Sequence, residues 1–408
     1  MSDERDGQPP DAPRAGPLAG LRVVEFSALI AGPSCARMLA DHGADVIKVE
    51  RFPDGDVSRT LNAHGRRRAG MFVQHNLGKR GVCVDLTRPE GLEVALGLAR
   101  DADVLIEAFT PGVMDRLGLG WAALSALNPR LVMCSISGFG QTGPNARRPG
   151  YAHIAHAGTG WLAMQFLHHD PPQPPRGPGV AIADVVTGIT AFGAICAALV
   201  QRERTGLGEH VDCALFDSLF VANDDSLQRH LLTGEVDVFH HPVHATRDGW
   251  VTANIGPDLR AWQNVCRAMG RADLFEDPRF ATQSAVARHR GEATRLVREW
   301  LATLDTAEAE RRLVEHHVVV GVVKTIPEAV RQPQVTERGL VRRVHDPVLG
   351  DIDVVGTAPK YAASEARVRG PAPRLGEHNA QVLRERLGYD DARIAALRDA
   401  GVLREEGQ

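Results

Sequence analysis

One carboxylate stands in a setting where it could do covalent chemistry. Asp184 follows the apolar run 180–183 and begins an Ala- and Gly-rich helical stretch that extends to about Arg204. A helix start favours negative charge, and an Asp with its usual pKa of about 3.9 is ionised at neutral pH, so it can act as a nucleophile without a separate base. The same position is also typical of a plain helix N-cap. The residue alone leaves both interpretations open.

Histidines raise the question of a metal site. His153 and His156 are three residues apart, and adjacent pairs occur at 168–169, 240–241 and 316–317. Zinc sites are usually closed by a third or fourth ligand at motif spacing, which is missing here, and adjacent histidines point to different faces of a helix or strand. We therefore predict no metal. The sequence also lacks a GxSxG elbow, a P-loop and a GxGxxG turn after its first strand, so hydrolase, kinase and dinucleotide-binding functions are not supported.

Composition narrows the class of protein further. The 408 residues carry 47 Lys and Arg against 51 Asp and Glu, a balance that argues against a nucleic-acid binder. Six cysteines without a CxxC pair indicate reduced thiols and a cytoplasmic protein. Residues 1–17 form a polar tail that lacks the apolar stretch of a signal peptide, and the longest apolar run, 189–200, is too short for a membrane span.

The elements that must position these residues alternate between strand and helix. Apolar strand patterns occur at 21–26, 45–50, 81–86, 103–107 and 131–136, and helical patterns between them occur at 34–42, 89–100 and 121–126. This alternation predicts βαβ units, and hence a doubly wound α/β domain with a parallel sheet.

The character of the sequence changes near residue 225. A strand pair at 244–255 with the turn signal Asp248-Gly249, two helices at 261–269 and 291–304, and a strand at 318–324 indicate a smaller α/β domain. We therefore expect a disordered tail at 1–17, a large domain at 18–224, a small domain at 225–330, and a segment at 331–408 that returns to the large domain.

A series of local signatures covers nearly the whole chain after residue 17. They are AGP at 31–33, GADVIKVER at 43–51, GKR at 78–80, FTPGVMDRLGL at 109–119, NPRLVMCSISGFGQTGP at 128–144, IADVVTGITA at 182–191, RTGLGEHVD at 204–212, EDPRF at 276–280 and APRLGEHN at 372–379. In this order and spacing the sequence resembles the class III CoA-transferase family (CaiB/BaiF-like), which also includes the α-methylacyl-CoA racemases.

The resemblance implies a Rossmann-like large domain built from both ends of the chain, a small middle domain, and an interlocked homodimer. It implies an acyl-CoA thioester and a carboxylic acid as substrates, with no tightly bound cofactor. It also assigns Asp184 the role of nucleophile: the carboxylate forms a mixed anhydride with the acyl group, then an aspartyl-CoA thioester that the acceptor acid attacks.

The choice between transferase and racemase depends on the run Gly150-Tyr151-Ala152-His153. Racemases abstract an α-proton with the His of a Gly-His-Asp motif and the helix aspartate. Tyr151 stands where that His would be, and Ala152 replaces an Asp common to both branches. His153 lies two residues beyond that position, so it could replace the racemase His only if the local backbone shifted. The transferase interpretation is therefore favoured. A racemase and a non-catalytic CoA-binding paralogue remain the alternatives.

The same resemblance supplies candidates for substrate binding. For the phosphates and adenine of CoA they are Arg51, Lys79, Arg80, Phe109 and Arg116. For the acyl pocket they are Ile30, Leu61, Met71, Phe139, Gly140, Tyr151 and, in the small domain, Gly256. Four of these pocket positions (30, 61, 71 and 139) lack the polar or larger aromatic group of formyl-CoA:oxalate transferases. Oxalate carries two charges, and each needs hydrogen-bond donors in the pocket. We therefore expect a larger or partly apolar acid rather than oxalate.

Overall fold

The computed structural model divides the chain into two compact units. One comprises residues 1–232 and 336–408, and the other comprises residues 233–335. The structure describes residues 14–61, 63, 68–165, 177–236, 242–254 and 258–407. The histidine pairs at 168–169 and 240–241, Gly256 and most of the N-terminal tail lie outside this range.

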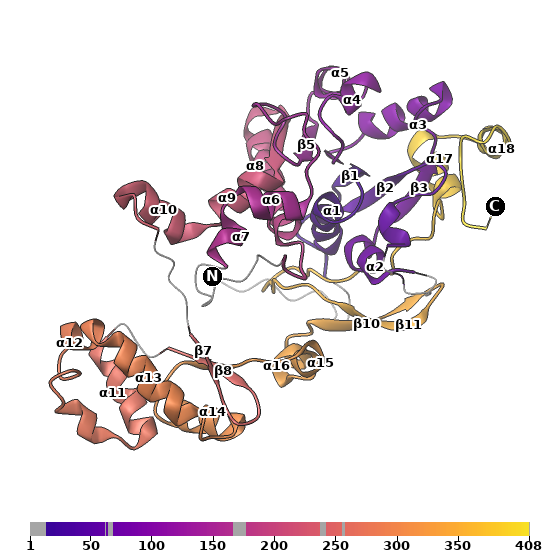
Figure 1. The fold of residues 1–408 in the computed structure, drawn as a ribbon. Coiled ribbons are helices and arrows are strands. Elements are labelled where there is room, and N and C mark those ends of the chain that lie inside the picture. The colour runs from indigo at the N-terminus through magenta and orange to yellow at the C-terminus, as the bar shows by residue number, and fades with distance from the viewer. Residues whose placement is uncertain are drawn as a thin grey trace, which may run out of the picture. The chain divides into compact units, whose positions relative to one another are not determined.

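A six-stranded parallel sheet forms the centre of the first unit (Figure 1). Its strands follow the order β3-β2-β1-β4-β5-β6. They are β1 (Arg22–Phe26), β2 (Asp45–Arg51), β3 (Arg80–Val84), β4 (Val104–Glu107), β5 (Val132–Ser137) and β6 (Glu209–Ala214). The order in which successive strands are added to the sheet reverses between β1 and β4. Doubly wound sheets open a ligand crevice at such a point, outside the carboxyl ends of their strands. The predicted α/β fold with a parallel-sheet large domain is confirmed.

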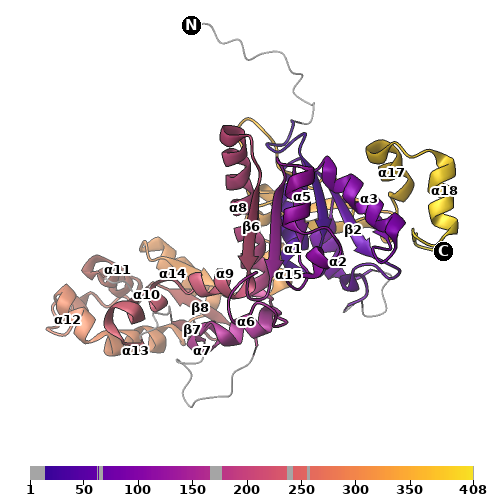
Figure 2. The same cartoon turned by 90° about the horizontal axis from the view of Figure 1, so that it is seen from above.

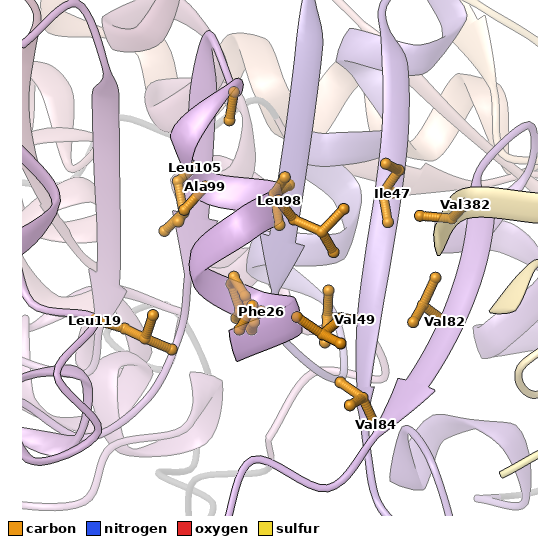
Figure 3. Packing of buried hydrophobic residues seen from close by; sticks show 14 of the residues in the cluster. Phe26, Ile47, Val49, Val82, Val84, Leu98, Ala99, Leu105, Leu119 and Val382 are labelled. Carbon is orange, nitrogen blue, oxygen red and sulfur yellow. The ribbon is translucent and has the colours of Figure 1, made fainter. Parts of the chain in front are cut away.

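Helices cover both faces of this sheet. On one face, Phe26, Val49 and Val82 pack with Leu98 of α3 (Pro89–Arg100) and Val382 of α17 (Asn379–Leu387), as Figure 3 shows. On the other face lie α1 (Ala31–Asp41) and α8 (Ile182–Thr205). Because both faces are buried, the central strands are nearly continuous apolar runs.

The long helix α8 packs against α1, β5 and β6. Its buried side includes Thr187, Ala191, Ile195 and Leu199, whereas Ile189 and other residues of the opposite side are exposed. Its 24 residues make it the only candidate membrane span by length and composition among the described residues, a test that core helices of globular proteins also pass.

The C-terminal part of the chain completes the first unit. The hairpin of β10 (Val341–Asp346) and β11 (Gly350–Val355) packs against α2 (Gly70–Asn76). Helix α17 packs on β3 and α3, and with α18 (Asp391–Asp399) it lies at the edge of the sheet opposite β6 (Figure 2). The shorter elements of this unit are η1 (Val57–Arg59), α4 (Val113–Arg116), α5 (Trp121–Leu127), α6 (Ala152–Gly158), α7 (Trp161–Met164) and α9 (Leu215–Val221). Two helices span the boundaries between the units: α10 (Asp224–Thr233) leads into the second unit, and α16 (Pro333–Glu337) leads back from it.

The second unit combines a three-stranded antiparallel sheet with helices. The strands are β7 (Val243–Ala245), β8 (Trp250–Ala253) and β9 (Val320–Val322). The helices are α11 (Leu259–Met269), η2 (Ala272–Phe275), α12 (Gln283–Arg288), α13 (Arg290–Leu301), α14 (Thr306–Glu315) and α15 (Ile326–Val330). The rings of Trp262 and Phe280 pack in a tilted arrangement, with centroids 4.9 Å apart, in its separate hydrophobic core.

Candidate active site

Asp184 lies in the first turn of α8, where it faces the start of α1. Burial raises its pKa to about 6, against the opposing effects of the Ala31 N–H, its own N–H and the charge of His153. The N-cap of α8 is Ala181, and no side chain caps this helix start. The alternative of Asp184 as a plain N-cap is therefore wrong. A partly desolvated carboxylate between two helix starts is suited to nucleophilic attack, because it is poorly hydrated yet still ionised at neutral pH.

The two helices approach closely because small residues line their contact. A Cβ on Gly188 would lie 2.1 Å from Ser34 Oγ and 3.0 Å from the Ala31 carbonyl oxygen, so any other residue would push α1 away from Asp184. The turn before α1 is equally constrained. Leu29 has a φ of 68°, an uncommon conformation for a residue other than glycine, and its N–H donates to Asp56 Oδ1 at 3.2 Å.

His156 supports the start of α8 from the other side. Its Nε2 accepts a hydrogen bond from the Ala183 N–H at 3.2 Å, and its ring packs against Trp161. The side chain is buried, and burial lowers its pKa, which favours the neutral form that this acceptor role requires. The sequence raised His156 as a possible metal ligand, whereas in the structure its ring supports the start of α8. Within the described part of the chain, no three His, Cys, Asp or Glu residues lie close enough together to hold a metal ion.

A cavity of about 170 Å³ opens beside Asp184 at the crevice between β1 and β4. Its walls include Ala28 after β1, Phe109 after β4 and Ser137 at the end of β5, together with Tyr151. Residues from six parts of the chain, including Asp184 and Leu215 after β6, thus meet at one point. They do so because the carboxyl ends of parallel strands share one edge of the sheet.

Glycine allows the chain segments near this cavity to cross. The Cα atoms of Gly138 and Gly150 are so close that a Cβ on either would lie 2.7 Å from the other's Cα. This contact holds the segment that carries Tyr151 against the end of β5. Tyr151 precedes α6, and its ring stacks on that of His153 at 6.1 Å. Tyr151, rather than His153, reaches the cavity wall.

A second cavity, of about 220 Å³, lies along the ends of β1, β2 and β3. It shares Ala28 and Phe109 with the first cavity, so the two are neighbours. Arg51 lines it, and the Arg51 side chain is 79% exposed. Arg116, at the end of α4, is exposed as well. Glu107, buried at the end of β4, accepts the Phe109 N–H at 2.8 Å and so holds the wall between the cavities; burial raises the pKa of Glu107 to about 7.

The structure corrects the expectation for two predicted CoA ligands. Lys79 has no exposed side-chain surface, and its Nζ donates to Glu25, Asn76 and the Pro33 carbonyl. No phosphate can reach it. Arg80 begins β3 and pairs with Asp45 at the start of β2, so it lies at the amino end of the sheet, away from both cavities.

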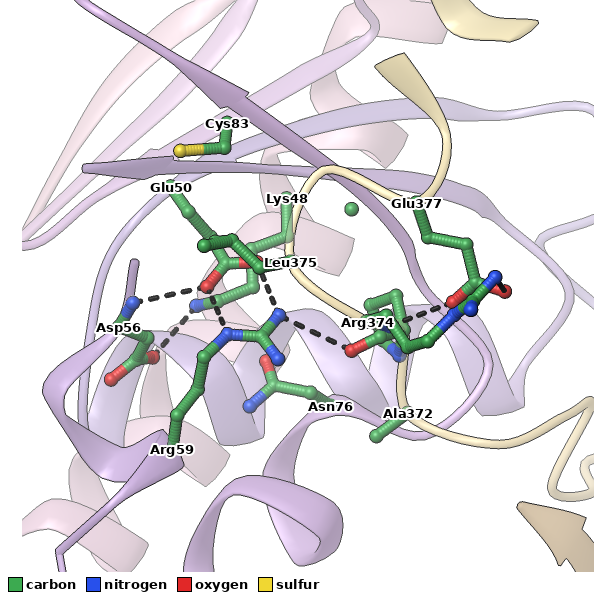
Figure 4. Close-up of polar contacts among 12 residues, drawn as sticks. Lys48, Glu50, Asp56, Arg59, Asn76, Cys83, Ala372, Arg374, Leu375 and Glu377 are labelled. Atoms are coloured by element: carbon green, nitrogen blue, oxygen red, sulfur yellow. Dashed lines mark hydrogen bonds and ion pairs between the residues drawn. The ribbon is translucent and has the colours of Figure 1, made fainter. Parts of the chain in front are cut away.

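Lys79 belongs instead to a buried ion cluster, two of whose carboxylates, Glu50 and Asp56, line the second cavity. Lys48 bonds Glu25 at 3.1 Å and Asp56 at 3.0 Å. Figure 4 shows Lys48 and Asp56 beside the pair of Arg59 with Glu50, which extends the network. Burial lowers the pKa of Lys79 to about 8, whereas additional carboxylates outweigh burial and raise the pKa of Lys48. The cluster contacts the β1–α1 turn at three backbone groups, those of Ser27, Leu29 and Pro33. It therefore holds the turn that faces Asp184.

The predicted acyl-pocket residues separate into two groups. Tyr151 lines the first cavity, and Phe139 and Gly140 continue directly from its wall at Gly138. Ile30 is the N-cap residue of α1, between two residues of the cavity wall. Leu61 and Met71 do not contribute to either cavity in the described structure. One charged residue of the cavity, Arg148, was not predicted, because no local pattern marks it; it lies three residues before Tyr151.

The chain belongs to CoA-transferase family III, whose family model matches residues 18–379. It is accordingly a CoA-transferase enzyme.

CoA-transferases of other organisms and a solved structure of the same family align with most of this chain. The chain is 32% identical to succinyl-CoA–D-citramalate CoA-transferase of Chloroflexus aurantiacus, with 95% of this chain and 98% of that protein aligned. It is 35% identical to succinate–glutarate CoA-transferase of Agrobacterium fabrum, with coverages of 91% and 96%. A crystal structure of a CaiB/BaiF family protein from Brucella suis superposes with a TM-score of 0.80 at 33% identity, covering 91% of this chain and all of that one.

Proposed function

We propose that this enzyme transfers CoA from a dicarboxylic acyl-CoA to a carboxylic acid through covalent intermediates on Asp184. The observation that carries the proposal is the half-buried Asp184 carboxylate, which lies between two helix starts and lines the cavity at the crevice of the sheet. The acyl class follows the relatives, which are named for succinyl-CoA or succinate and for citramalate or glutarate.

Each step exchanges one acyl bond for another. An Asp184 oxygen attacks the thioester carbonyl, the C–S bond breaks, and CoA thiolate leaves a mixed anhydride. The thiolate then attacks the Asp184 carbonyl carbon, which releases the donor's carboxylate and leaves an aspartyl-CoA thioester. The acceptor carboxylate and the returning thiolate repeat these two steps in reverse, which frees Asp184. Backbone N–H groups at the start of α1, of which Ala31 is nearest to Asp184, are the available donors for the oxyanions.

CoA itself is proposed to occupy the second cavity. Phe109 offers an aromatic face there, Arg51 lines the wall, and Arg116 is exposed on α4. Guanidinium groups are suited to phosphates because they bind two oxygens at once. Arg51→Gln should weaken CoA binding about tenfold without changing the folded state, as measured by calorimetry at a fixed salt concentration.

The central experiment is to trap the intermediate. Incubation with succinyl-CoA followed by hydroxylamine or borohydride should modify Asp184, located by peptide mass spectrometry. Asp184→Asn should give no adduct while retaining CoA binding, and Asp399→Asn, which removes an exposed carboxylate at the end of α18, should give the parental yield. Undiminished transfer by Asp184→Asn would refute the mechanism.

Incubation of the enzyme with succinyl-CoA in deuterated water, without an acceptor acid, separates the two alternative functions. Solvent deuterium that enters the α-carbon of the acyl group without an acceptor would identify racemase chemistry. CoA binding with neither adduct nor exchange would identify a non-catalytic paralogue.

The assembly and location are also proposals. An interlocked homodimer is supported by the apolar residues that the described first unit leaves exposed, among them Ile189, Val200, Val221 and Leu231. A cytoplasmic location is supported by six free cysteines, of which five are buried. Light scattering of the purified enzyme would measure the assembly directly.

A further inference from the structure

Arg148 introduces a positive charge into the cavity that holds Asp184. Of the described residues that line this cavity, Arg148 and Asp184 carry charge at neutral pH. The Arg148 side chain is exposed, and within the described part of the chain no carboxylate pairs with it. Other arginines of the same unit, such as Arg59 and Arg202, are held by carboxylates. The Arg148 guanidinium is thus available to a ligand.

The local structure holds Arg148 in this place. Its guanidinium carbon lies 5.6 Å from the centroid of the Phe139 ring, within the range of a cation–π contact. The Phe139 ring is itself supported by Phe216, at 5.7 Å, and by Gly150, where a Cβ would lie 3.2 Å from the ring. A backbone hydrogen bond from the Arg148 N–H to the Asn145 carbonyl, at 2.8 Å, closes the turn before it.

A dicarboxylic acyl group creates an electrostatic problem in this cavity. Its distal carboxylate would enter a partly desolvated space that already contains the Asp184 carboxylate, and like charges repel strongly where water is scarce. A guanidinium compensates for such a charge, because its planar fork donates two parallel hydrogen bonds to a carboxylate. A monocarboxylic acyl chain of the same length would not need it.

We infer that Arg148 binds the distal carboxylate of the acyl group while its thioester carbon lies at Asp184, so that Arg148 selects dicarboxylic over monocarboxylic substrates. Phe139 acts as a positioning residue beneath the guanidinium. This inference rests on the proposed function and assigns the substrate class of that same cavity. It also explains how a cavity with the apolar residues Ile30 and Phe139 beside its wall can accept a second charge.

The test compares donors of equal length, succinyl-CoA and butyryl-CoA, with one acceptor. Arg148→Gln should lower kcat/KM for succinyl-CoA by about 10- to 100-fold, the loss of a charge-assisted hydrogen-bonded pair, and should change kcat/KM for butyryl-CoA less than about threefold. The kcat/KM of Arg148→Lys for succinyl-CoA should lie between those of the parent and of Arg148→Gln. Arg147→Gln is the matched control, because Arg147 is exposed next to Arg148 but does not line the cavity, and both rates should stay unchanged.

A binding measurement keeps the test independent of turnover. In the Asp184→Asn background, Arg148→Gln should weaken succinyl-CoA binding by a similar factor and leave the Kd of free CoA unchanged. An equal loss for both donors, a weaker Kd for free CoA, or no loss for succinyl-CoA would overturn the assignment of Arg148. Absence of an Asp184 adduct in the parent enzyme would overturn the proposed function instead.

Discussion

Replacement of Asp184 by Asn should stabilise the folded enzyme while abolishing CoA transfer. The carboxylate is partly buried and has no cationic partner within ion-pair distance among the described residues, so its negative charge is costly in the folded state. Asn has the same shape and can accept the Ala31 N–H without that charge. Gain of stability with loss of activity is the expected signature of a functional group held in an unfavourable environment.

The magnitude follows from the pKa of Asp184. A tenfold change in proton affinity is worth about 1.4 kcal/mol, so a pKa raised from 3.8 to about 6 corresponds to at most about 3 kcal/mol. Because the folded-state pKa is raised, folding stability falls as pH rises from 3.8 to about 6, and the full cost is present above that value. The free energy of unfolding of Asp184→Asn should therefore exceed that of the parent by about 3 kcal/mol near pH 8 and by about half of that near pH 5.

Urea denaturation of both proteins at equal concentration, from pH 5 to pH 8, measures this difference. Asp54→Asn is the control, because it removes an exposed carboxylate and should change the free energy of unfolding by less than about 0.5 kcal/mol. If Asp184→Asn gives no added stability near pH 8, or if its advantage does not shrink toward pH 5, the desolvation of Asp184 is refuted.

Three further outcomes are expected. The kcat/KM for the acyl-CoA donor should fall about tenfold per pH unit below about pH 6, because protonated Asp184 cannot attack; a flat profile down to pH 5 would contradict this. Lys79→Met should lower the free energy of unfolding by about 3–5 kcal/mol in urea denaturation, because Glu25 stays buried with one cation fewer, and a loss below about 1 kcal/mol would contradict the structural role. Gly188→Ala should reduce both turnover and Tm, because its Cβ collides with α1. Gly193→Ala is the control on the same helix: its Cβ would enter open space, so this variant should keep full activity and match or exceed the parental Tm. Equal behaviour of the two variants would contradict the close contact of α1 and α8.

Five of the six strands of the sheet were predictable because they are buried on both faces, whereas β6, whose first four residues are at least partly exposed, was not predicted. Strands buried on both faces appear in the sequence as short, nearly continuous apolar runs, and the helical patterns between them require parallel crossovers. The predicted ranges 45–50 and 89–100 correspond closely to β2 and α3. Helix α1 begins at Ala31 rather than at 34, because proline is tolerated in the first turn of a helix. Residue 184 was expected to start α8, which begins two residues earlier.

The candidate site was predictable only where a local pattern accompanies a residue. Asp184 could be singled out from its place at a helix start and from the signature around it. Arg148 and His156 could not, because their roles depend on segments that meet at the cavity only after the sheet has formed.

The amino-acid sequence by itself determined the alternation of strands and helices, the family signatures and the position of Asp184, since each of these depends on neighbouring residues. The tertiary structure decided which charged residues face a ligand. Lys79 and Arg51 are equally basic in the sequence, but Lys79 pairs with Glu25, 54 residues away, and is fully buried, whereas Arg51 stays exposed beside a cavity. The difference arises because burial and ion pairing depend on distances between segments that are far apart along the chain.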